Sequence, residues 1–183
     1  MRDADKPSSS YLRYLQNGGE MSRLICSYDW STTSLGHPET WSQGLLTTLG
    51  IILRSKFPMF LWWGPELIQF YNDAYRPSFG NEGKHPKALG QHGKDCWEEI
   101  WPAVEPLINQ IRNGGEATWE EDAMISIYRN GHLEDVYWTF SYSQVIDGNG
   151  EIGGVLATCF ETTSKIEAQQ RINQALKELS KRD

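Results

Sequence analysis

Cysteine, long apolar runs and excess positive charge are all scarce in this 183-residue sequence. Its three cysteines, Cys26, Cys96 and Cys159, are too few and odd in number for a disulfide framework, which favours a reducing cytoplasm. No stretch reaches the roughly 18 consecutive apolar residues of a membrane span. The first residues, MRDADK, carry charge instead of the apolar core of a signal peptide. We therefore expect a cytoplasmic protein that does not insert into a membrane.

The charge balance argues against nucleic acid as a partner. Asp and Glu number 24 against 17 Lys and Arg, which gives a net charge of −7, whereas binding a phosphate backbone needs clustered cations. Aromatic residues, by contrast, are abundant, with eight Trp and eight Tyr. Side chains of that size must line a core, a pocket or an interface. The length suits one domain with extensions, or at most two small domains.

The first third of the chain predicts a lead-in followed by helices. Residues 1–18 are expected to be a disordered or weakly ordered lead-in: residues 1–10 are polar, and residues 11–16 predict at most one turn of helix, which Asn17-Gly18-Gly19 ends. Residues 19–56 predict a helical extension, beginning with a short helix at 20–28. A longer amphipathic helix is predicted over 38–56, because Pro38 suits a first helical turn and apolar residues follow at near-helical spacing.

The middle of the chain predicts two strands and a helix. Apolar runs at 57–63 and 67–71 flank turn residues and indicate a hairpin. Prolines and glycines predict irregular structure over 72–92. Apolar residues at helical spacing predict a helix over 98–113.

Alternating patterns after residue 116 predict three longer strands at 117–128, 134–146 and 151–160. The sequence Asp147-Gly148-Asn149-Gly150 is a strong hairpin signal between the last two strands. The order of elements predicts an α+β fold, in which both strand groups share one five-stranded antiparallel sheet with short helices on one face.

Residues 164–183 predict a charged terminal helix. Ser164 and Glu167 match a capping box, with Ser164 at the N-cap. Ile172, Leu176 and Leu179 follow a four-then-three spacing, which is a fragment of a coiled-coil heptad. The alternative is a helix packed on its own sheet.

Several short motifs resemble those of PAS domains. Four of them occur in the PAS order: Phe70-Tyr71-Asn72-Asp73-Ala74-Tyr75, Leu89-Gly90, Ile146-Asp147-Gly148-Asn149-Gly150 and Glu161-Thr162-Thr163. Others are similar to a PAS subgroup at the N-terminal sensor end of bacterial histidine kinases: Asp29-Trp30-Ser31, Leu35-Gly36, Phe57-Pro58-Met59, Trp63-Gly64-Pro65-Glu66 and Phe140-Ser141-Tyr142-Ser143. Gln144 departs from this subgroup, which tends to have Pro there.

The resemblance implies a PAS domain over residues 57–163 with a sensory or signal-relay function. It implies a homodimer formed through the flanking helices, and a C-terminal helix that passes the signal to a downstream kinase or other output domain. The chain itself contains no kinase motifs, so we predict no enzymatic activity for it. Two alternatives stay open, namely an interaction-only PAS domain without a ligand, and a small-molecule-binding enzyme or redox domain.

The alternation of Trp138, Phe140 and Tyr142 with polar residues places these aromatic side chains on the inward face of the sheet. By resemblance to PAS domains, that face lines a cavity, although the aromatic side chains alternatively fill it. The residues predicted to line the cavity are Met59, Leu61, Trp97, Trp101, Ile125, Ile127, Trp138, Phe140, Tyr142, Val155, Ala157 and Cys159. The residues predicted at the signal exit are Glu161, Thr163 and Ser164.

No cofactor or metal is predicted, and room is left for an unidentified small ligand. Cys96 lies near the position of the reactive cysteine of LOV photosensors, a flavin-binding PAS subclass, but the Arg and Gln that hold the flavin are missing after it. The predicted helix at 98–113 lacks the histidine of haem-binding PAS domains. His85, His92 and Cys96 match no zinc spacing and favour a surface loop. No catalytic residue is predicted, since the acidic run at 120–122 is typical of a solvated strand edge.

Overall fold

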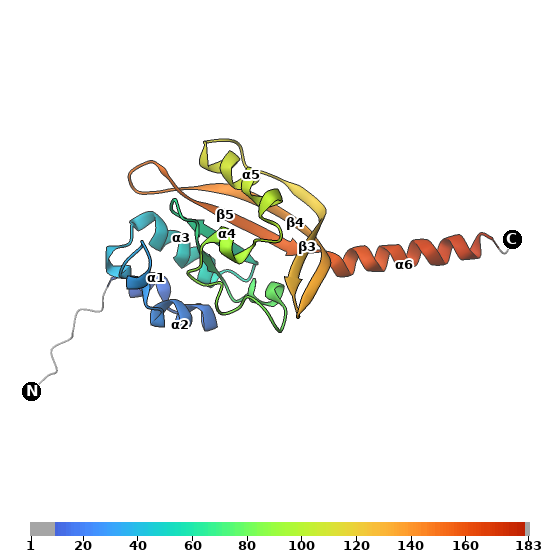
Figure 1. Ribbon diagram of the computed structural model, residues 1–183, viewed down its shortest axis with the longest axis horizontal. Coiled ribbons are helices and arrows are strands. Elements are labelled where there is room, and N and C mark those ends of the chain that lie inside the picture. Colours follow the sequence, from blue (N-terminus) through green and yellow to red (C-terminus); the bar gives the residue numbers. More distant parts are fainter. Residues whose placement is uncertain (1–9, 182–183) are drawn as a thin grey trace, which may run out of the picture.

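The computed structural model describes residues 10–181 and contains one antiparallel sheet with helices around it (Figure 1). In chain order the elements are α1 (Leu12–Leu15), α2 (Gly19–Ser27), η1 (Trp30–Thr32), η2 (Pro38–Thr40), α3 (Gln43–Arg54), β1 (Met59–Trp63), β2 (Ile68–Tyr71), η3 (Arg76–Phe79), α4 (Gly93–Cys96), α5 (Trp101–Arg112), β3 (Glu120–Arg129), β4 (His132–Ile146), β5 (Ile152–Glu161) and α6 (Thr163–Leu179), where η marks a 3₁₀ helix.

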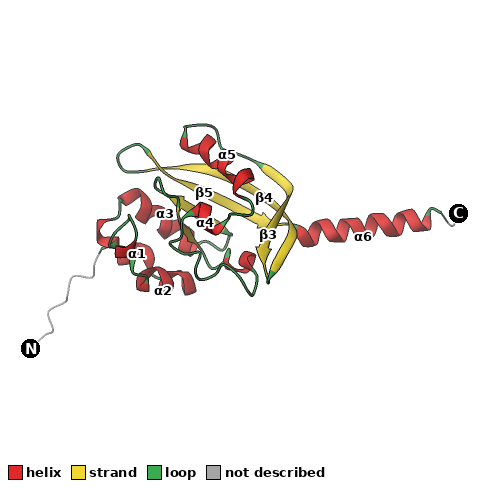
Figure 2. Cartoon of the chain, viewed as in Figure 1, coloured by secondary structure: helices red, strands yellow, loops and turns green. Residues whose placement is uncertain are grey.

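The five strands follow the order β2-β1-β5-β4-β3. β1 pairs antiparallel with β5, with Phe60 opposite Ala157, so the two strand groups form a single sheet as predicted. The segment with η3, α4 and α5 covers one face of this sheet, and Figure 2 shows the helices lying across the strands. The predicted α+β class with its five-stranded antiparallel sheet is confirmed.

The opposite face of β1 and β2 is covered by the N-terminal extension. α3 packs there, and its apolar stripe, which includes Leu45, Leu49 and Ile52, is buried within the chain. Both faces of β1 and β2 are therefore covered, and the buried residues 60–63 and 68–71 become part of the core. This burial leaves Ile51, with 61% of its surface exposed, as the large apolar side chain that α3 presents to solvent.

The helix predicted over 38–56 is shorter than expected. Pro38 begins a separate 3₁₀ turn, and α3 begins only at Gln43. The backbone of Trp41 is extended, which interrupts the helical path. Its side chain is buried and donates the indole N–H to the Gly36 carbonyl at 2.9 Å. Ser42 is the true N-cap of α3, because its hydroxyl accepts the Leu45 N–H at 3.3 Å.

The predicted lead-in over 1–18 divides into two parts. Residues 1–9 lie outside the described residues. In residues 10–18, α1 forms a helical turn whose Leu15 is fully buried, so this part packs on the domain instead of being weakly ordered. The fully buried side chain explains the order, since it contributes to the same core as α3.

Asn72 connects the extension to the sheet. Its side-chain amide donates to the carbonyls of Ile52 at 3.0 Å and Phe57 at 2.8 Å. Its side-chain oxygen accepts the N–H groups of Met59 at 3.1 Å and Tyr75 at 3.0 Å. One fully buried residue thus satisfies backbone groups at the end of α3, the start of β1 and the segment after β2.

The terminal helix α6 projects away from the domain (Figure 1). None of its described residues is buried, and Ile172, Leu176 and Leu179 are 54%, 59% and 60% exposed. The alternative of a helix packed on its own sheet is therefore wrong. The predicted capping box is also wrong, because the N-cap position is Thr162 and Ser164 lies inside the first turn.

Candidate functional site

A cavity of about 50 Å³ lies between the inward face of the sheet and the helices that cover it. Most of its walls are aromatic. The residues that line it are Phe60, Trp62, Tyr75, Trp97, Ile100, Val104, Ile125, Ile127, Trp138, Phe140, Tyr142, Ala157 and Cys159.

The predicted inward face of the long strands lies at this cavity. Trp138, Phe140 and Tyr142 are 6%, 6% and 7% exposed and all line it. The other predicted residues that the structure brings together there are Trp97, Ile125, Ile127, Ala157 and Cys159. Alternation along β4 and β5 positions these side chains, because every second residue points to the same face.

Four predicted residues lie elsewhere. Met59 and Leu61 point to the opposite face of β1, toward the N-terminal extension, because their neighbours Phe60 and Trp62 line the cavity. Trp101 packs instead beside Gly93 and Trp62: a Cβ placed on Gly93 would lie 3.1 Å from the Trp101 ring. Val155 is fully buried opposite Trp62 but is not part of the lining.

Stacked rings hold the cavity wall in place. Phe79 stacks on Trp97 with centroids 5.6 Å apart, and Tyr75 stacks on Trp138 at 6.3 Å. Tyr75 also lies 5.0 Å from the Phe60 ring. Since large rings in contact have few alternative packings, a change at one ring displaces its neighbours.

Three polar groups on these walls have no partner in the described chain. The hydroxyls of Tyr75 and Tyr142 take part in no hydrogen bond, and the buried indole N–H of Trp97 also has no acceptor. Burial raises the pKa of both tyrosine hydroxyls well above the ordinary value, so they remain neutral. The residues that line the cavity therefore contribute no charge, and the Trp97 N–H has almost no accessible surface there.

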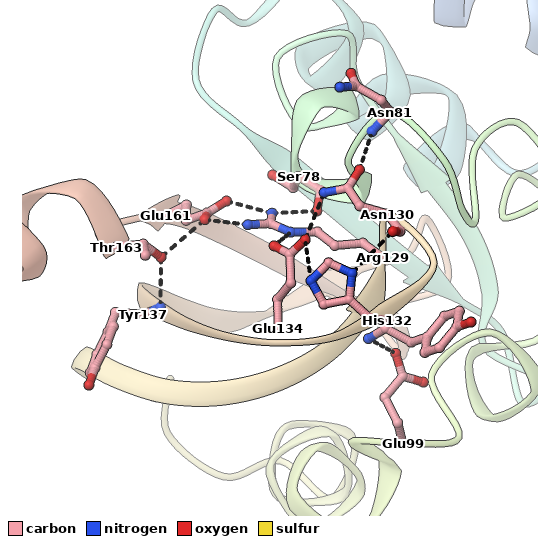
Figure 3. Close-up of polar contacts among 11 residues, drawn as sticks. Ser78, Asn81, Glu99, Arg129, Asn130, His132, Glu134, Tyr137, Glu161 and Thr163 are labelled. Carbon is pink, nitrogen blue, oxygen red and sulfur yellow. Dashed lines mark hydrogen bonds and ion pairs between the residues drawn. The ribbon is translucent and has the colours of Figure 1, made fainter.

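Arg129 lies at the centre of a polar cluster where β5 meets α6 (Figure 3). Its guanidinium donates twice to Glu161, at 2.7 and 2.8 Å, and its Nε donates to Glu134 at 2.7 Å. Nη1 also donates to the Ser78 carbonyl of η3 at 3.0 Å. Arg129 is 9% exposed, and its hydrogen bonds with Glu161, followed by those with Glu134, raise its pKa above the ordinary value.

The cluster continues into the first turn of α6. The Thr163 hydroxyl donates to Glu161 at 3.0 Å and accepts the Tyr137 N–H of β4 at 3.0 Å. The predicted exit residues Glu161 and Thr163 thus contact each other, whereas Ser164 is exposed and outside the cluster. No prediction from the sequence included Arg129, because it lies in the connection between the strands predicted at 117–128 and 134–146.

A second contact holds the base of α6. The Lys165 ammonium lies 2.9 Å from the Asp122 carboxylate, and this hydrogen bond lowers the pKa of Asp122. Asp122 lies at the bulge of β3, with φ of +48°. The acidic run at 120–122 therefore includes a residue that attaches α6 to the sheet, a use that its sequence did not indicate.

The candidate metal set does not assemble. His85 lies between Tyr71 and Glu20, at 2.9 and 3.1 Å, which joins α2 to the segment after β2. His92 is near Glu66, at 3.6 Å. Across residues 10–181 no group of three or more His, Cys, Asp or Glu side chains is placed to hold a metal ion.

The cavity does not fit a flavin. Cys96 is buried and its thiol pKa is raised by that burial to about 11, but it is not among the lining residues. No lining side chain is cationic, so nothing there matches the phosphate of a flavin nucleotide. Likewise, no histidine lines the cavity for a haem.

The strand order and the helices over one face form a PAS-like arrangement. The fold is PAS-like. No protein-family model matches the sequence, and no curated protein matches it. Within residues 10–181 no helix is long and apolar enough to cross a membrane.

Several solved structures are similar to this PAS-like chain. An RNA-binding light-oxygen-voltage receptor is 18% identical, with 76% of this chain and 37% of that chain covered and a TM-score of 0.49. This chain thus spans little more than a third of that receptor. A sensory box sensor histidine kinase from Vibrio cholerae is 13% identical over 64% and 86% of the two chains, with a TM-score of 0.42. The LOV domain of a blue-light activated histidine kinase from Erythrobacter litoralis is 16% identical over 60% and 99%, with a TM-score of 0.45.

Proposed function

We propose that this chain is a sensory or signal-relay domain that passes a signal through α6 to a downstream output module. The supporting observation is the contact of Arg129 with both Ser78 and Glu161. Ser78 belongs to η3, which begins directly after the cavity residue Tyr75. Glu161 is the last residue of β5, immediately before the helix. One side chain therefore contacts both the 3₁₀ helix that follows a cavity residue and the base of the output helix.

The relay operates through displacement of η3. A change at Tyr75 moves the Ser78 carbonyl, because the two are three residues apart in one short helical turn. The hydrogen bond from Arg129 to the Ser78 carbonyl then lengthens or shortens, and the bidentate contact of Arg129 with Glu161 changes as a result. The first turn of α6 follows, since Thr163 binds Glu161 directly. A relay needs a two-state element, and in this proposal the Arg129 cluster is that element.

The output surface in this proposal is the exposed seam of α6. Ile172, Leu176 and Leu179 repeat at coiled-coil spacing and are free to pair with the same helix of a second copy. The homodimer through flanking helices then depends mainly on α6, because the apolar stripe of α3 is buried within the chain. The downstream module, on the PAS resemblance, is a histidine kinase, and the unpaired state of Cys26, Cys96 and Cys159 suits a cytoplasmic location.

The interaction-only alternative is favoured by one observation, the small size of the cavity, at about 50 Å³. In this alternative, aromatic side chains fill the core, no ligand binds, and the domain transmits a conformational change from one bound protein to another. The enzyme alternative has less support, since the lining residues include no acid, histidine or lysine to transfer a proton. A partner-driven relay and a ligand-driven relay share the Arg129 contact, so both are tested by changing it.

The test is a fusion of the full chain, after Asp183, to a histidine kinase core that lacks its own sensor. Arg129→Gln is expected to change autophosphorylation about fivefold, which corresponds to a coupling free energy of about 1 kcal/mol. Arg23→Gln is the matched control, because Arg23 is exposed on α2 and has no hydrogen bond or ion pair in the described chain. Equal activity of the two variants in fusions that fold normally would refute the relay.

A further inference from the structure

The two edges of the sheet differ, because the chain itself covers only one of them. At the β2 edge, Gln69 donates its N–H to the Gln91 carbonyl at 3.1 Å and accepts the Gly90 N–H at 2.9 Å. The opposite edge belongs to β3, which pairs only with β4 among residues 10–181. Unpaired backbone groups along a sheet edge are a template for another strand. The β3 edge is therefore the place where a further strand can pair.

The direction of the β3 backbone shows which groups are open. The Tyr128 N–H points away from β4, because it donates to the Glu99 carboxylate at 2.9 Å. Successive residues of an antiparallel strand direct their N–H and C=O groups to opposite edges, so Met124 and Ser126 share the direction of Tyr128. Outside the pairing of β3 with β4, neither has a backbone hydrogen bond within residues 10–181. Two donors and two acceptors therefore lie side by side along this edge.

Most of this edge lacks the features that normally prevent pairing. Charged side chains and bulges protect strand edges, and β3 has both over residues 120–122, where the bulge lies. Residues 123–128, by contrast, read AMISIY and contain neither charge nor proline. On the outer face of the sheet, Met124 and Tyr128 are 59% and 49% exposed. An added strand would therefore place its own side chains beside two apolar ones.

The charges beside the edge indicate the kind of partner. Residues 120–121 are exposed glutamates at one end of the open stretch. Asp135 lies beside its middle and accepts the Ser126 hydroxyl. Lys165 does not offset these charges, because it is already paired with Asp122 at 2.9 Å. A segment with lysine or arginine at the end that passes residues 120–121 complements this surface, whereas an acidic segment is repelled.

We propose that the free edge of β3 binds an extended segment of another protein, which adds a sixth strand antiparallel to β3. The segment alternates apolar and polar residues and carries its basic residues at its C-terminal end, where it passes residues 120–121. Antiparallel pairing is the more stable arrangement per residue. A second copy of the chain is disfavoured at this edge, because it brings the same acidic residues. This binding site goes beyond the proposed relay and does not depend on it.

The test is an NMR titration of the full chain, labelled with ¹⁵N, with a synthetic peptide of three threonine–valine pairs followed by two lysines. Binding is expected to slow hydrogen exchange of the Met124 and Ser126 amide protons. The amide protons of Ile125 and Ile127, which bond to β4, should be protected with or without the peptide. The same peptide ending in two glutamates should bind about tenfold more weakly.

Ser126→Pro and Ser126→Ala form a matched pair of variants. Proline removes the outward N–H and leaves the bonds to β4 in place, whereas alanine removes only the hydroxyl. Peptide affinity should fall about tenfold in Ser126→Pro and stay within about twofold of the wild type in Ser126→Ala. Glu120→Gln combined with Glu121→Gln should weaken binding of the lysine peptide about fivefold. Both glutamates are exposed, so this double variant should fold normally.

The proposal is overturned if neither peptide saturates or if both bind equally. It is also overturned if a folded Ser126→Pro binds as tightly as Ser126→Ala. If Ser126→Pro does not fold, unchanged affinity of the double glutamine variant refutes the proposal instead. Self-association that depends on the β3 edge and not on α6 would assign this edge to a second copy, which contradicts the proposal. The kinase-fusion test needs no peptide, so its result is independent of this titration.

Discussion

The guanidinium of Arg129 donates two hydrogen bonds to the carboxylate of Glu161, at 2.7 and 2.8 Å, at the point where β5 ends and α6 begins. The two residues are 32 positions apart and lie on strands that do not neighbour each other, since β4 separates β3 from β5. Parallel donors from a planar guanidinium fix the orientation of a carboxylate as well as its distance. Because Glu161 also accepts from Thr163, this pair contacts the first turn of α6.

Arg129→Gln is expected to lower the free energy of unfolding by about 1–3 kcal/mol, because Glu161, Glu134 and the Ser78 carbonyl lose a common donor in a largely buried place. Urea denaturation measures the change. Arg23→Gln, on the exposed surface of α2, should stay within about 0.5 kcal/mol of the wild type. Equal stability of the two variants would show that the cluster in Figure 3 contributes nothing to folding.

The contribution of Arg129 to the free energy of unfolding should also depend on pH. Arg129 lowers the pKa of Glu134 in the folded chain below its ordinary value. A carboxyl group with such a lowered pKa stabilises the fold fully above its unfolded pKa, about 4.3 for Glu, and the contribution is lost as the pH falls through the folded value. The stability difference between wild type and Arg129→Gln is therefore expected to shrink between pH 6 and pH 3.

The measurement is the urea unfolding midpoint of the wild type and of Arg129→Gln at several pH values from 6 to 3. Arg23→Gln, compared with the wild type in the same way, should give a difference that does not vary with pH. A stability difference for Arg129→Gln that stays constant with pH would mean that Arg129 does not lower the pKa of Glu134.

Phe140→Ala is expected to destabilise the chain by about 3–5 kcal/mol, because it removes a ring from the cavity wall and enlarges the void. Ser141→Ala, one residue along on the opposite face of β4, should cost less than about 0.5 kcal/mol. Thermal or urea unfolding compares the two. If Ser141→Ala destabilised the chain more than Phe140→Ala, the assigned register of β4 would be wrong by one residue, because such a shift exchanges the inward and outward side chains.

The register of β4 was predictable and that of β1 was not, for a physical reason. In β4 one face is buried and the other meets solvent, so Trp138 and Phe140 alternate with Thr139 and Ser141. β1 is covered on both faces, by α3 and by the cavity helices, and its residues from Phe60 to Trp63 are all buried. A strand buried on both faces has no alternation to read, so the sequence could not separate Leu61 from Phe60.

The exit cluster was predicted only in part, because its central contact is not local. Glu161 and Thr163 lie in a recognisable motif, and their positions follow from the end of the last strand. Arg129 reaches them through sheet pairing across β4, which no short pattern records. The start of α6 was misplaced for a similar reason. The Thr163 hydroxyl binds the β4 backbone at Tyr137, and this tertiary bond overrides the local capping preference of Ser164.

We expect two copies of the chain to associate through the exposed seam of α6. Replacing both Ile172 and Leu176 with Glu should abolish self-association in sedimentation equilibrium, because buried like charges in a two-stranded seam repel and their desolvation is not compensated. The fold of the domain should be unaffected, since both residues are more than half exposed. Ile51→Glu on α3 is the matched control. Ile51 is 61% exposed, so its replacement changes the outer surface of α3 without disturbing the core.

The two outcomes assign the interface to one helix or the other. If association uses α6, the seam variant is monomeric and Ile51→Glu still dimerises. Loss of the dimer in Ile51→Glu alone would assign the interface to the N-terminal extension. The seam spans barely two heptads of the 17-residue α6, so few apolar side chains are buried when two copies pair. The dimer of this chain should therefore be weak, and it should strengthen when α6 is extended by further heptads in the same register. A seam that extension does not strengthen would not be a coiled coil.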